Sequence, residues 1–542
     1  MTVNHPTRNV ITFDGTDASG FPYVFNNQNA QGATDTLTSQ PINLASTDTS
    51  VYLSFYWIGR GLGEQPDKGD SLRLQFRDLN GNWKTVWTKQ DTLRNPNFTY
   101  EFVAINNSKY LHPNFQFRFQ AFGRQSGRFD TWHLDYVYLN KKRELTDRFV
   151  RDVATRLPVS SFLKRYSAMP LKQYLAKPAA ETADSVFTDI RNLNNVFNPI
   201  TSTYTLRDEK SGKTIQTFEK LENIDALRSQ FRIAKPVLLS VPDSVKRVSL
   251  ISKFQLKTTD NDPVLTPRGV TVSIPGIDLR RNDSISGKTV LDDYYAYDDG
   301  TAEYAVYLNR PLGRTAVRYF LNRPDSVSAV RMNIVPILKD LVNQPLTIQI
   351  WSNKNGKPNA LLAQKSVRVQ YPATRNEFVE FSLDYGVAVR DTFYVGWLQI
   401  GQEGVAVGLD RNNRREDQIF VNLGQEWIPY TNFRNDPNLA FFNGSLLIRP
   451  VMGGKPLAPI TAIEEEKPTQ WIVFPNPTDG ILRWETDEIK QIEVFNSAGI
   501  SWRKITNNTQ KQLNLSELLD GLYFLKLSND KKSVIKKILL RK

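Results

Sequence analysis

Short stretches in which apolar and polar residues alternate recur along most of this chain, and they limit what it can fold into. In the stretch FQFRFQ at residues 115–120, every second residue is a phenylalanine. Successive side chains of a β-strand point to opposite faces, so this pattern places one face in a core and the other in water. Comparable stretches are separated by Gly, Pro and Asn, among them VYLSFYW from residue 51 and DSLRLQF from residue 70. The sequence therefore predicts an all-β protein.

The chain is too long for one core. It has 542 residues, and a single hydrophobic core stops growing near about 250 to 300 residues. Changes in pattern along the chain predict several domains. These are a β-sandwich over 1–140, a partly helical connector over 141–183, an immunoglobulin-like sandwich over 184–283, a further β-sandwich over 284–455, an acidic linker over 456–470 and a small sandwich over 471–542.

The connector contains the segment with a helical period. Leu145, Phe149, Val153 and Leu157 follow one another at intervals of four residues. This spacing places the four side chains along one side of a helix. We therefore expect a short helix here, ended by Pro158.

Composition excludes several classes of site and partner. The chain has no cysteine, so disulfides, thiolate metal sites and cysteine nucleophiles are ruled out. The net charge is +13, but the cations are scattered and no recognition helix is evident, so we expect no nucleic-acid partner. No run of about 18 apolar residues predicts a membrane-spanning helix.

The last domain carries a set of motifs. FPNPTDG begins at Phe474, IEVFNSAG follows, and LNLSELLDGLYFLKL precedes the basic final strand VIKKILL. Together these motifs resemble the type A sorting domain of the type IX secretion system of certain Gram-negative bacteria. The resemblance covers 471–542 and points to these residues as its sorting signal: Pro475, Asn476, Pro477, Gly480, Gly499, Gly521, Tyr523, Lys536 and Lys537.

This resemblance implies an immunoglobulin-like sandwich that the outer-membrane translocon and its sorting machinery recognise. The cargo is then released or attached to the cell surface, so a secreted or outer-surface location is expected. We expect the final strand to be recognised by strand addition, with Lys536 and Lys537 supplying charge. The first residues, MTVNHPTRNVITF, have no basic and apolar signal-peptide regions, and we expect the signal peptide to be missing from this chain.

The cargo also resembles a known family. DTLTSQPINL, WKTVW and GRFDTWHLDYVYL are similar to the MAM-like jelly roll of large surface proteins of the same bacteria. The resemblance implies a jelly roll over 1–140, with an earlier segment of it missing, and a second jelly-roll-like sandwich over 284–455.

No catalytic constellation is found in the sequence. The three histidines are His5, His112 and His133, and none has metal-ligand spacing. Alternation places Trp132 and Leu134 inward and His133 outward. We therefore expect a protein that is not an enzyme.

Two groups of acids are candidate calcium ligands, because Ca²⁺ prefers carboxylate oxygens. The first contains Asp298, Asp299 and Glu303. The second pairs Asp14, with Asp17 beside it, and Asp130, with Asp135 beside it. Solvated acids in turns are the alternative for both groups. We expect no other cofactor.

Aromatic residues of the first domain are candidate sugar-stacking residues, namely Trp57, Trp83, Trp87 and Trp132. Large aromatic residues in strands are otherwise part of a core, which is the alternative. The glycine-rich loop GRGLGEQPDKGD at residues 59–70 is typical of a binding loop on a rigid sheet.

The sequence thus favours a secreted or surface protein that binds or adheres to a surface glycan or protein. One alternative is a polysaccharide-processing enzyme or accessory with carbohydrate-binding modules. Another is a structural component of a surface layer or a motility apparatus.

Overall fold

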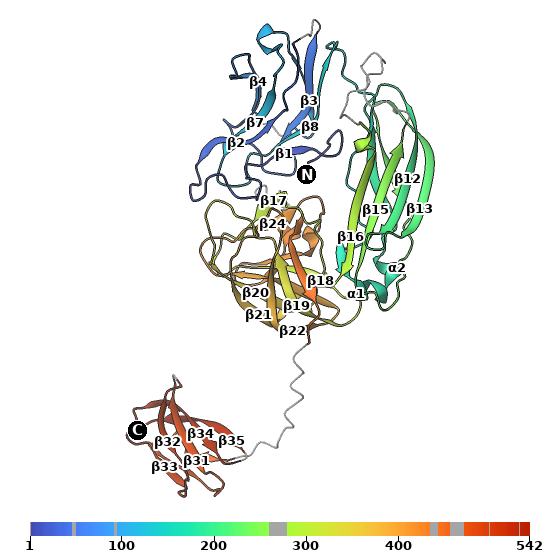
Figure 1. The fold of residues 1–542 in the computed structure, drawn as a ribbon. Coiled ribbons are helices and arrows are strands. Elements are labelled where there is room, and N and C mark those ends of the chain that lie inside the picture. Colours follow the sequence, from blue (N-terminus) through green and yellow to red (C-terminus); the bar gives the residue numbers. More distant parts are fainter. Residues whose placement is uncertain are drawn as a thin grey trace. The chain divides into compact units, whose positions relative to one another are not determined.

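The computed structural model describes residues 2–45, 50–90, 95–258, 279–433, 443–455, 471–497, 499–530 and 532–542. The chain divides into two compact units, residues 1–457 and 458–542. Strands dominate both units (Figure 1), which confirms the all-β prediction. The predicted acidic linker, residues 456–470, lies outside the described residues.

The first sandwich consists of two antiparallel four-stranded sheets. One has the order β1-β8-β3-β6 (Ile11–Phe13, Trp132–Lys141, Val51–Gly59, Thr99–Ala104). The other has the order β2-β7-β4-β5 (Gln31–Thr38, Phe117–Arg124, Ser71–Arg77, Trp83–Lys89). Phe55 from one sheet and Phe119 from the other are both fully buried, with ring centroids 4.8 Å apart. The alternation seen in the sequence therefore forms the core between these sheets.

The middle sandwich is larger than the predicted 184–283. One sheet has the order β10-β16-β15-β12-β13 (Ala168–Pro170, Ser284–Asp292, Val248–Lys257, Asn198–Asp208, Thr214–Ile224). The other has the order β14-β11-β9 (Ser229–Ala234, Val186–Asn192, Val153–Thr155). Strands β9 and β10 come from the predicted connector, and β16 comes from the predicted next domain.

The helix expected from Leu145 to Leu157 is wrong. Leu145 is 61% exposed, and β9, within this segment, pairs with β11. All three residues of β9 are fully buried, whereas an amphipathic helix would bury only one side. The strand pairing with β11 therefore determines the structure here, and the four-residue spacing does not. The helical part of the connector lies later, in α1 (Leu171–Ala176) and α2 (Pro178–Glu181).

The third sandwich contains three sheets. Its largest has the order β21-β20-β23-β18-β25-β26 (Lys357–Arg368, Pro345–Lys354, Thr392–Gln399, Arg314–Phe320, Ile419–Asn422, Trp427–Pro429). The others are β22-β19-β28 (Val379–Val389, Asp325–Met332, Ile448–Met452) and β17-β24-β27 (Tyr304–Val306, Val407–Asp410, Ser445–Leu446). One continuous apolar cluster includes Tyr204 of the middle sandwich and Trp397 of the third, so these two sandwiches share a core.

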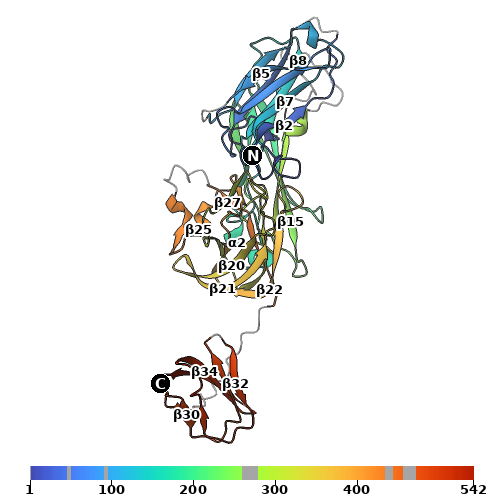
Figure 2. The same cartoon turned by 90° about the vertical axis from the view of Figure 1, so that its left-hand side faces the viewer.

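The second unit has a core of its own. Its sheets have the orders β29-β30-β33 (Val473–Phe474, Ile481–Trp484, Gln512–Asn514) and β32-β31-β34-β35 (Ser501–Ile505, Gln491–Asn496, Gly521–Ser528, Ser533–Leu540), several of which Figure 2 shows. Trp484 and Leu525, one from each sheet, are almost fully buried in one cluster. A separate core is the physical requirement for independent folding.

Candidate functional site

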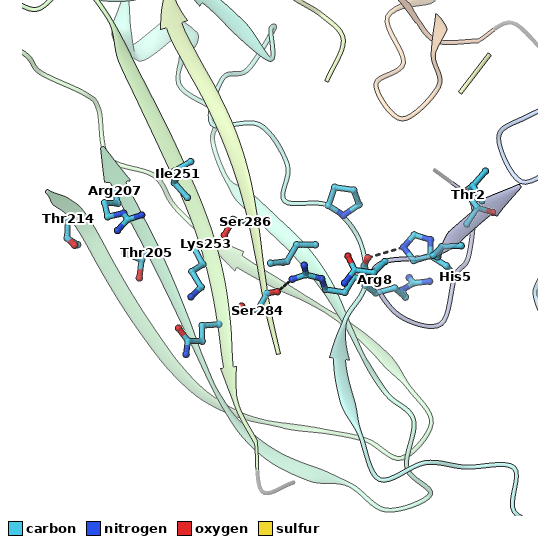
Figure 3. A pocket seen from close by; sticks show the side chains of 17 residues that line it. Thr2, His5, Arg8, Thr205, Arg207, Thr214, Ile251, Lys253, Ser284 and Ser286 are labelled. Carbon is cyan, nitrogen blue, oxygen red and sulfur yellow. Dashed lines mark hydrogen bonds between the residues drawn. The ribbon is translucent and has the colours of Figure 1, made fainter. Parts of the chain in front are cut away.

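A cleft of about 1010 Å³ in the first unit lies between the N-terminal segment and the middle sandwich. One side is formed by residues 2–12, and the other mainly by the outer face of β12, β15 and β16 (Figure 3). The lining residues are Thr2, His5, Arg8, Asn9, Val10, Thr12, Arg156, Pro158, Thr205, Arg207, Thr214, Ile251, Lys253, Gln255, Ser284, Ile285 and Ser286.

The period of two along each strand sets which side chains face this cleft. On β12, Tyr204 and Leu206 are buried in the core, whereas Arg207 is exposed on the opposite face. Lys253 of β15 lies beside Thr205 of β12 and beside Ser286 of β16 in the sheet register. Neighbouring strands therefore present a row of cationic and hydroxyl side chains to the cleft.

The N-terminal side of the cleft is anchored to both sandwiches. The backbone N–H of Arg8 donates to the carbonyl oxygen of Thr155 at 3.0 Å, and its guanidinium reaches the carbonyl of Ser284 (Figure 3). On the first sandwich, Asp135 of β8 accepts hydrogen bonds from the backbone N–H of Thr7 at 2.6 Å and from its hydroxyl at 2.7 Å. These contacts hold residues 7 and 8 in place and so fix the width of the cleft there.

The lining carries positive charge. It contains four cations, Arg8, Arg156, Arg207 and Lys253, and no carboxylate. Arg156 is neutralised by an ion pair with Asp189, but the side chains of Arg207 and Lys253 form no hydrogen bond or ion pair with any residue that the structure describes. A group with negative charge is therefore the ligand that this lining favours.

His5 contributes polarity rather than charge. Its Nε2 lies 2.9 Å from the carbonyl oxygen of Arg156, for which it is a donor in the matching tautomer. Burial lowers the pKa of His5 below its usual value, so the side chain is neutral at neutral pH.

His133 points away from the core, as alternation predicts, but it is not solvated. It is 1% exposed, because the N-terminal segment and the β3–β4 loop cover the outer face of β8. Its ring nitrogens lie 2.9 Å from Thr12 Oγ1 and 3.2 Å from the carbonyl oxygen of Arg60. Burial lowers its pKa to about 3.

The tryptophans expected to stack on sugars are largely core residues. Trp132 is 0% and Trp57 7% exposed, and Trp57 packs against Trp87 and Trp132 with centroids 5.7 and 6.0 Å away. The stacking prediction is wrong for Trp57 and Trp132, because their rings face the opposite sheet. Trp87 and Trp83 are half-buried, and the Arg118 guanidinium lies 4.4 Å from the Trp83 ring centroid.

The first group of predicted calcium ligands is already partnered. Asp298 is buried and forms a forked ion pair with Arg449. The Asn412 side-chain amide donates to Asp299 at 3.0 Å and to Glu303 at 2.9 Å. The prediction that Asp298 binds calcium is therefore wrong, since the guanidinium occupies its oxygens.

The second predicted group is divided. Asp14 forms an ion pair with Arg375, and its Oδ1 accepts a hydrogen bond from Thr16 at 2.8 Å. Asp130 instead lies in an acidic cluster with Asp67 and Asp70, from the glycine-rich loop. The predicted pairing of Asp14 with Asp130 is therefore wrong, and calcium binding by Asp130 stays a prediction.

In the second unit, Asn476 connects the segment after β29 to the last strand. Its Nδ2 donates to the carbonyl oxygen of Lys537 at 2.7 Å, and its Oδ1 accepts from the backbone N–H of Leu539 at 2.9 Å. Pro475 and Pro477 flank it in the connection from β29 to β30. The Asn side chain therefore pairs with β35 as a backbone peptide group would.

Of the three glycines predicted in the sorting signal, Gly480 and Gly499 lie in bends of the chain and Gly521 lies in a strand. Gly480 has φ +131°, and a Cβ added there would lie 2.8 Å from Ser516 Oγ. Gly499 has φ +77° and donates its N–H to the carbonyl of Asn496 at 3.0 Å. Gly521 begins β34, where the Tyr523 hydroxyl donates to the carbonyl of Leu519 at 3.0 Å.

Residues 472–541 match the family model described as "Secretion system C-terminal sorting domain". The second unit is a type IX secretion sorting domain. The search of curated proteins gives no match. In the part of the chain that the structure describes, no helix combines the length and the apolar character of a membrane span.

Solved structures similar to part of the chain include two glycoside hydrolases. Bacteroides uniformis β-glucuronidase is 14% identical over 56% of this chain and 33% of its own, with a TM-score of 0.21. A glycosyl hydrolase family 2 member from Bacteroides cellulosilyticus is 11% identical over 46% of this chain and 28% of its own, with a TM-score of 0.20. The chain spans about a third of their length, and likeness at these scores carries no argument about function.

The last strand of the sorting domain lies at the edge of its sheet. β35 pairs with β34 on one side. On the other side, the backbone N–H of Thr478 donates to the carbonyl of Leu539 at 2.9 Å, and no strand pairs with Ser533–Lys536 among the described residues. Lys537 is exposed and Lys536 half-buried. A role of these residues in sorting stays a prediction.

Sequence reasoning missed the cleft. Arg207 and Lys253 are cations at outward positions of predicted strands, and that alternation is the signal that marks them as exposed. Nothing in the sequence indicates that residues 2–12 pack beside them, because this contact joins segments about two hundred residues apart in the chain.

Proposed function

We propose that the protein is a surface or secreted binding protein that holds an acidic polysaccharide in the cleft between its N-terminal segment and its middle sandwich. The sorting domain directs it to export by the type IX secretion system. The observation that carries the proposal is the lining of the cleft, which has four cations and no carboxylate.

The hydroxyl side chains in the lining support the proposal that the anionic ligand is a polysaccharide. Five hydroxyl side chains line the cleft besides the cations, those of Thr12, Thr205, Thr214, Ser284 and Ser286, together with that of Thr2 at its end. Hydroxyl groups both donate and accept hydrogen bonds, as sugar hydroxyls require, and guanidinium groups bind carboxylates. A volume of about 1010 Å³ accommodates several sugar units.

No Phe, Tyr or Trp lines the cleft, which argues against two other classes of ligand. Single-stranded nucleic acids bind on aromatic platforms that alternate with cations. Neutral sugars bind through stacking on exposed aromatic rings. Neither mode has the residues that it needs in this lining.

Binding rather than hydrolysis is part of the proposal. Most glycoside hydrolases use a pair of carboxylic residues on either side of the scissile bond. All residues that line this cleft are described, and none of them is acidic. The lining therefore supports retention of the polymer, as in adhesion.

Retention of the full chain on immobilised polysaccharides tests the proposal. Polygalacturonate is the acidic probe, and a neutral galactan is the matched control. We expect binding to polygalacturonate that weakens as salt rises, no binding to galactan, and no release of reducing sugar from either. Equal binding to both polysaccharides, or tighter binding to single-stranded DNA of equal charge, would contradict the proposal.

A further inference from the structure

Three carboxylates meet in the first sandwich, away from the cleft. One oxygen each from Asp67, Asp70 and Asp130 lies within 4.8 Å of the others. Asp67 and Asp70 belong to the loop between β3 and β4, whereas Asp130 lies between β7 and β8. Asp70 is 1% and Asp130 5% exposed, so two of the three are almost completely removed from water.

Each buried carboxylate has one oxygen with a partner and one without. Oδ2 of Asp70 accepts from the backbone N–H of Asp67 at 2.6 Å, and Oδ2 of Asp130 accepts from that of Arg124 at 2.6 Å. Oδ1 of both residues is buried and accepts from no N–H or O–H donor of another described residue. A buried charged oxygen without a partner is costly, and a bound cation would supply a partner to both atoms.

The charges of the cluster do not balance. Three carboxylates face one cation, the Arg124 guanidinium, which lies 3.1 Å from Asp67. A fourth carboxylate, that of Glu64, accepts the backbone N–H of Asp130 at 3.1 Å. The carboxylates therefore outnumber the cation that is paired with them, and a divalent cation would reduce this excess of negative charge.

We propose that Asp67, Asp70 and Asp130 bind a calcium ion. Calcium takes about six to eight oxygen ligands and accepts carboxylates from separate loops, with water completing the shell. Magnesium requires stricter octahedral geometry, and zinc favours nitrogen and sulfur ligands. Modules outside the cell bind calcium with dissociation constants of about 10⁻⁴ to 10⁻³ M, which suits a protein with a sorting domain for export.

Calcium at this position would link two loops of the first sandwich through its ligands. It ties the β3–β4 loop to the chain between β7 and β8. The same β3–β4 loop contacts the third sandwich, where the Arg411 guanidinium donates to the carbonyl oxygen of Leu62 at 2.6 Å. The ion therefore stabilises the first sandwich and orders the loop at this contact.

The test compares thermal unfolding of the full chain in EDTA and in about 1 mM Ca²⁺, with calcium titration calorimetry alongside. We expect calcium to raise the unfolding midpoint of the first sandwich by several degrees. Asp70→Asn, which keeps the shape of the side chain and removes its charge, is expected to weaken calcium binding at least tenfold. Asp17→Asn is the matched control, because Asp17 is a turn residue of the same sandwich outside the cluster.

Thermal unfolding of the Asp70→Asn variant in EDTA shows whether the variant has lost only calcium binding or has also lost its folded structure. Removing one charge relieves the repulsion in the empty cluster, so Asp70→Asn should unfold in EDTA at or above the temperature of the unsubstituted protein. The proposal is overturned if calcium leaves the midpoint unchanged, if magnesium raises it equally, or if Asp70→Asn binds calcium as tightly as the unsubstituted protein.

Discussion

The side-chain oxygen of Asn476 accepts a hydrogen bond from the backbone N–H of Leu539 at 2.9 Å. The amide nitrogen of the same side chain donates to the carbonyl of Lys537. One side chain thus satisfies two backbone groups on the outer edge of β35, and Thr478 satisfies the next. The FPNP motif therefore pairs with one half of this outer edge, whereas Ser533–Lys536, which pair with β34 on their inner side, have no partner strand on the outer side among the described residues.

Replacing Asn476 with alanine should destabilise the sorting domain by about 1–3 kcal/mol, since two backbone groups lose their partner. Urea unfolding of residues 471–542, which have their own core, measures this change. Ser501→Ala is the control, because Ser501 is exposed and contacts only the Glu493 side chain outside its strand pairing; we expect a change within about 0.5 kcal/mol there. If both variants were equally stable, the hydrogen bonds of Asn476 to β35 would not contribute to the stability of the domain.

Ile535→Pro tests recognition of the open edge by strand addition. Ile535 and Leu539 are four residues apart, so their backbone N–H groups point to the same side of β35, away from β34. Proline removes that outward donor and is tolerated on an edge strand. We expect export to fall at least tenfold while the domain remains folded by circular dichroism. Ile535→Val retains the donor and should be exported normally; full export of the proline variant would exclude this mode of recognition.

In the cleft, Arg207→Ala and Lys253→Ala should each weaken binding of polygalacturonate about tenfold, because each removes a charge-assisted contact of about 1.5–3 kcal/mol. Lys288→Ala is the matched control. Lys288 lies on the outer face of the same sheet but pairs with Glu209 and does not line the cleft. Calorimetry at two salt concentrations gives the affinity of each variant for polygalacturonate. Equal losses of affinity in all three variants would mean that binding depends on the net charge of the protein and not on the cleft.

The buried His133 makes stability depend on pH. Its pKa is about 3 in the folded protein and 6.5 when exposed. Between these values the unfolded chain binds more protons, so stability falls as pH falls, by at most about 1.4 kcal/mol per pH unit. Asp135, whose pKa burial raises to about 6 from its usual 3.8, acts in the opposite sense between these two values.

Comparison with His133→Gln isolates the histidine, since Asp135 is common to both proteins. Going from pH 7 to pH 5, the unsubstituted protein should lose about 2 kcal/mol more than the variant. Urea unfolding followed by tryptophan fluorescence gives both values. If the free energy of unfolding changed equally with pH in both proteins, the folded and unfolded chains would bind protons at His133 equally well, and the prediction would be wrong.

The alternation of residues was sufficient to predict the strands but not what covers them. Phe119 is buried, as the pattern at 115–120 predicts, because core and solvent faces follow directly from a period of two. His133 obeys the same period yet is buried, since the N-terminal segment packs on the outer face of its strand. A face is exposed only if no distant segment covers it, and sequence pattern carries no information about that.

The spacing of residues in the sequence was also insufficient to predict the structure of the connector and the grouping of the acidic residues. Val153 fits a helical stripe but lies in a fully buried strand, a distinction that depends on pairing with β11. Asp130 was predicted to bind calcium together with Asp14, whereas the structure places it beside Asp67 and Asp70 from a separate loop. In contrast, the sorting motifs lie within one short segment, where local sequence suffices to identify the domain.

The central claim is that the second unit is an independent export signal for the β-sandwich cargo. Its most direct test fuses residues 458–542 to a periplasmic fluorescent protein in a bacterium that has a type IX secretion system. We predict that the fluorescent protein reaches the cell surface or the medium, and that it stays in the periplasm without the fusion. Retention of the fused protein in the periplasm, with the sorting domain intact, would contradict the account.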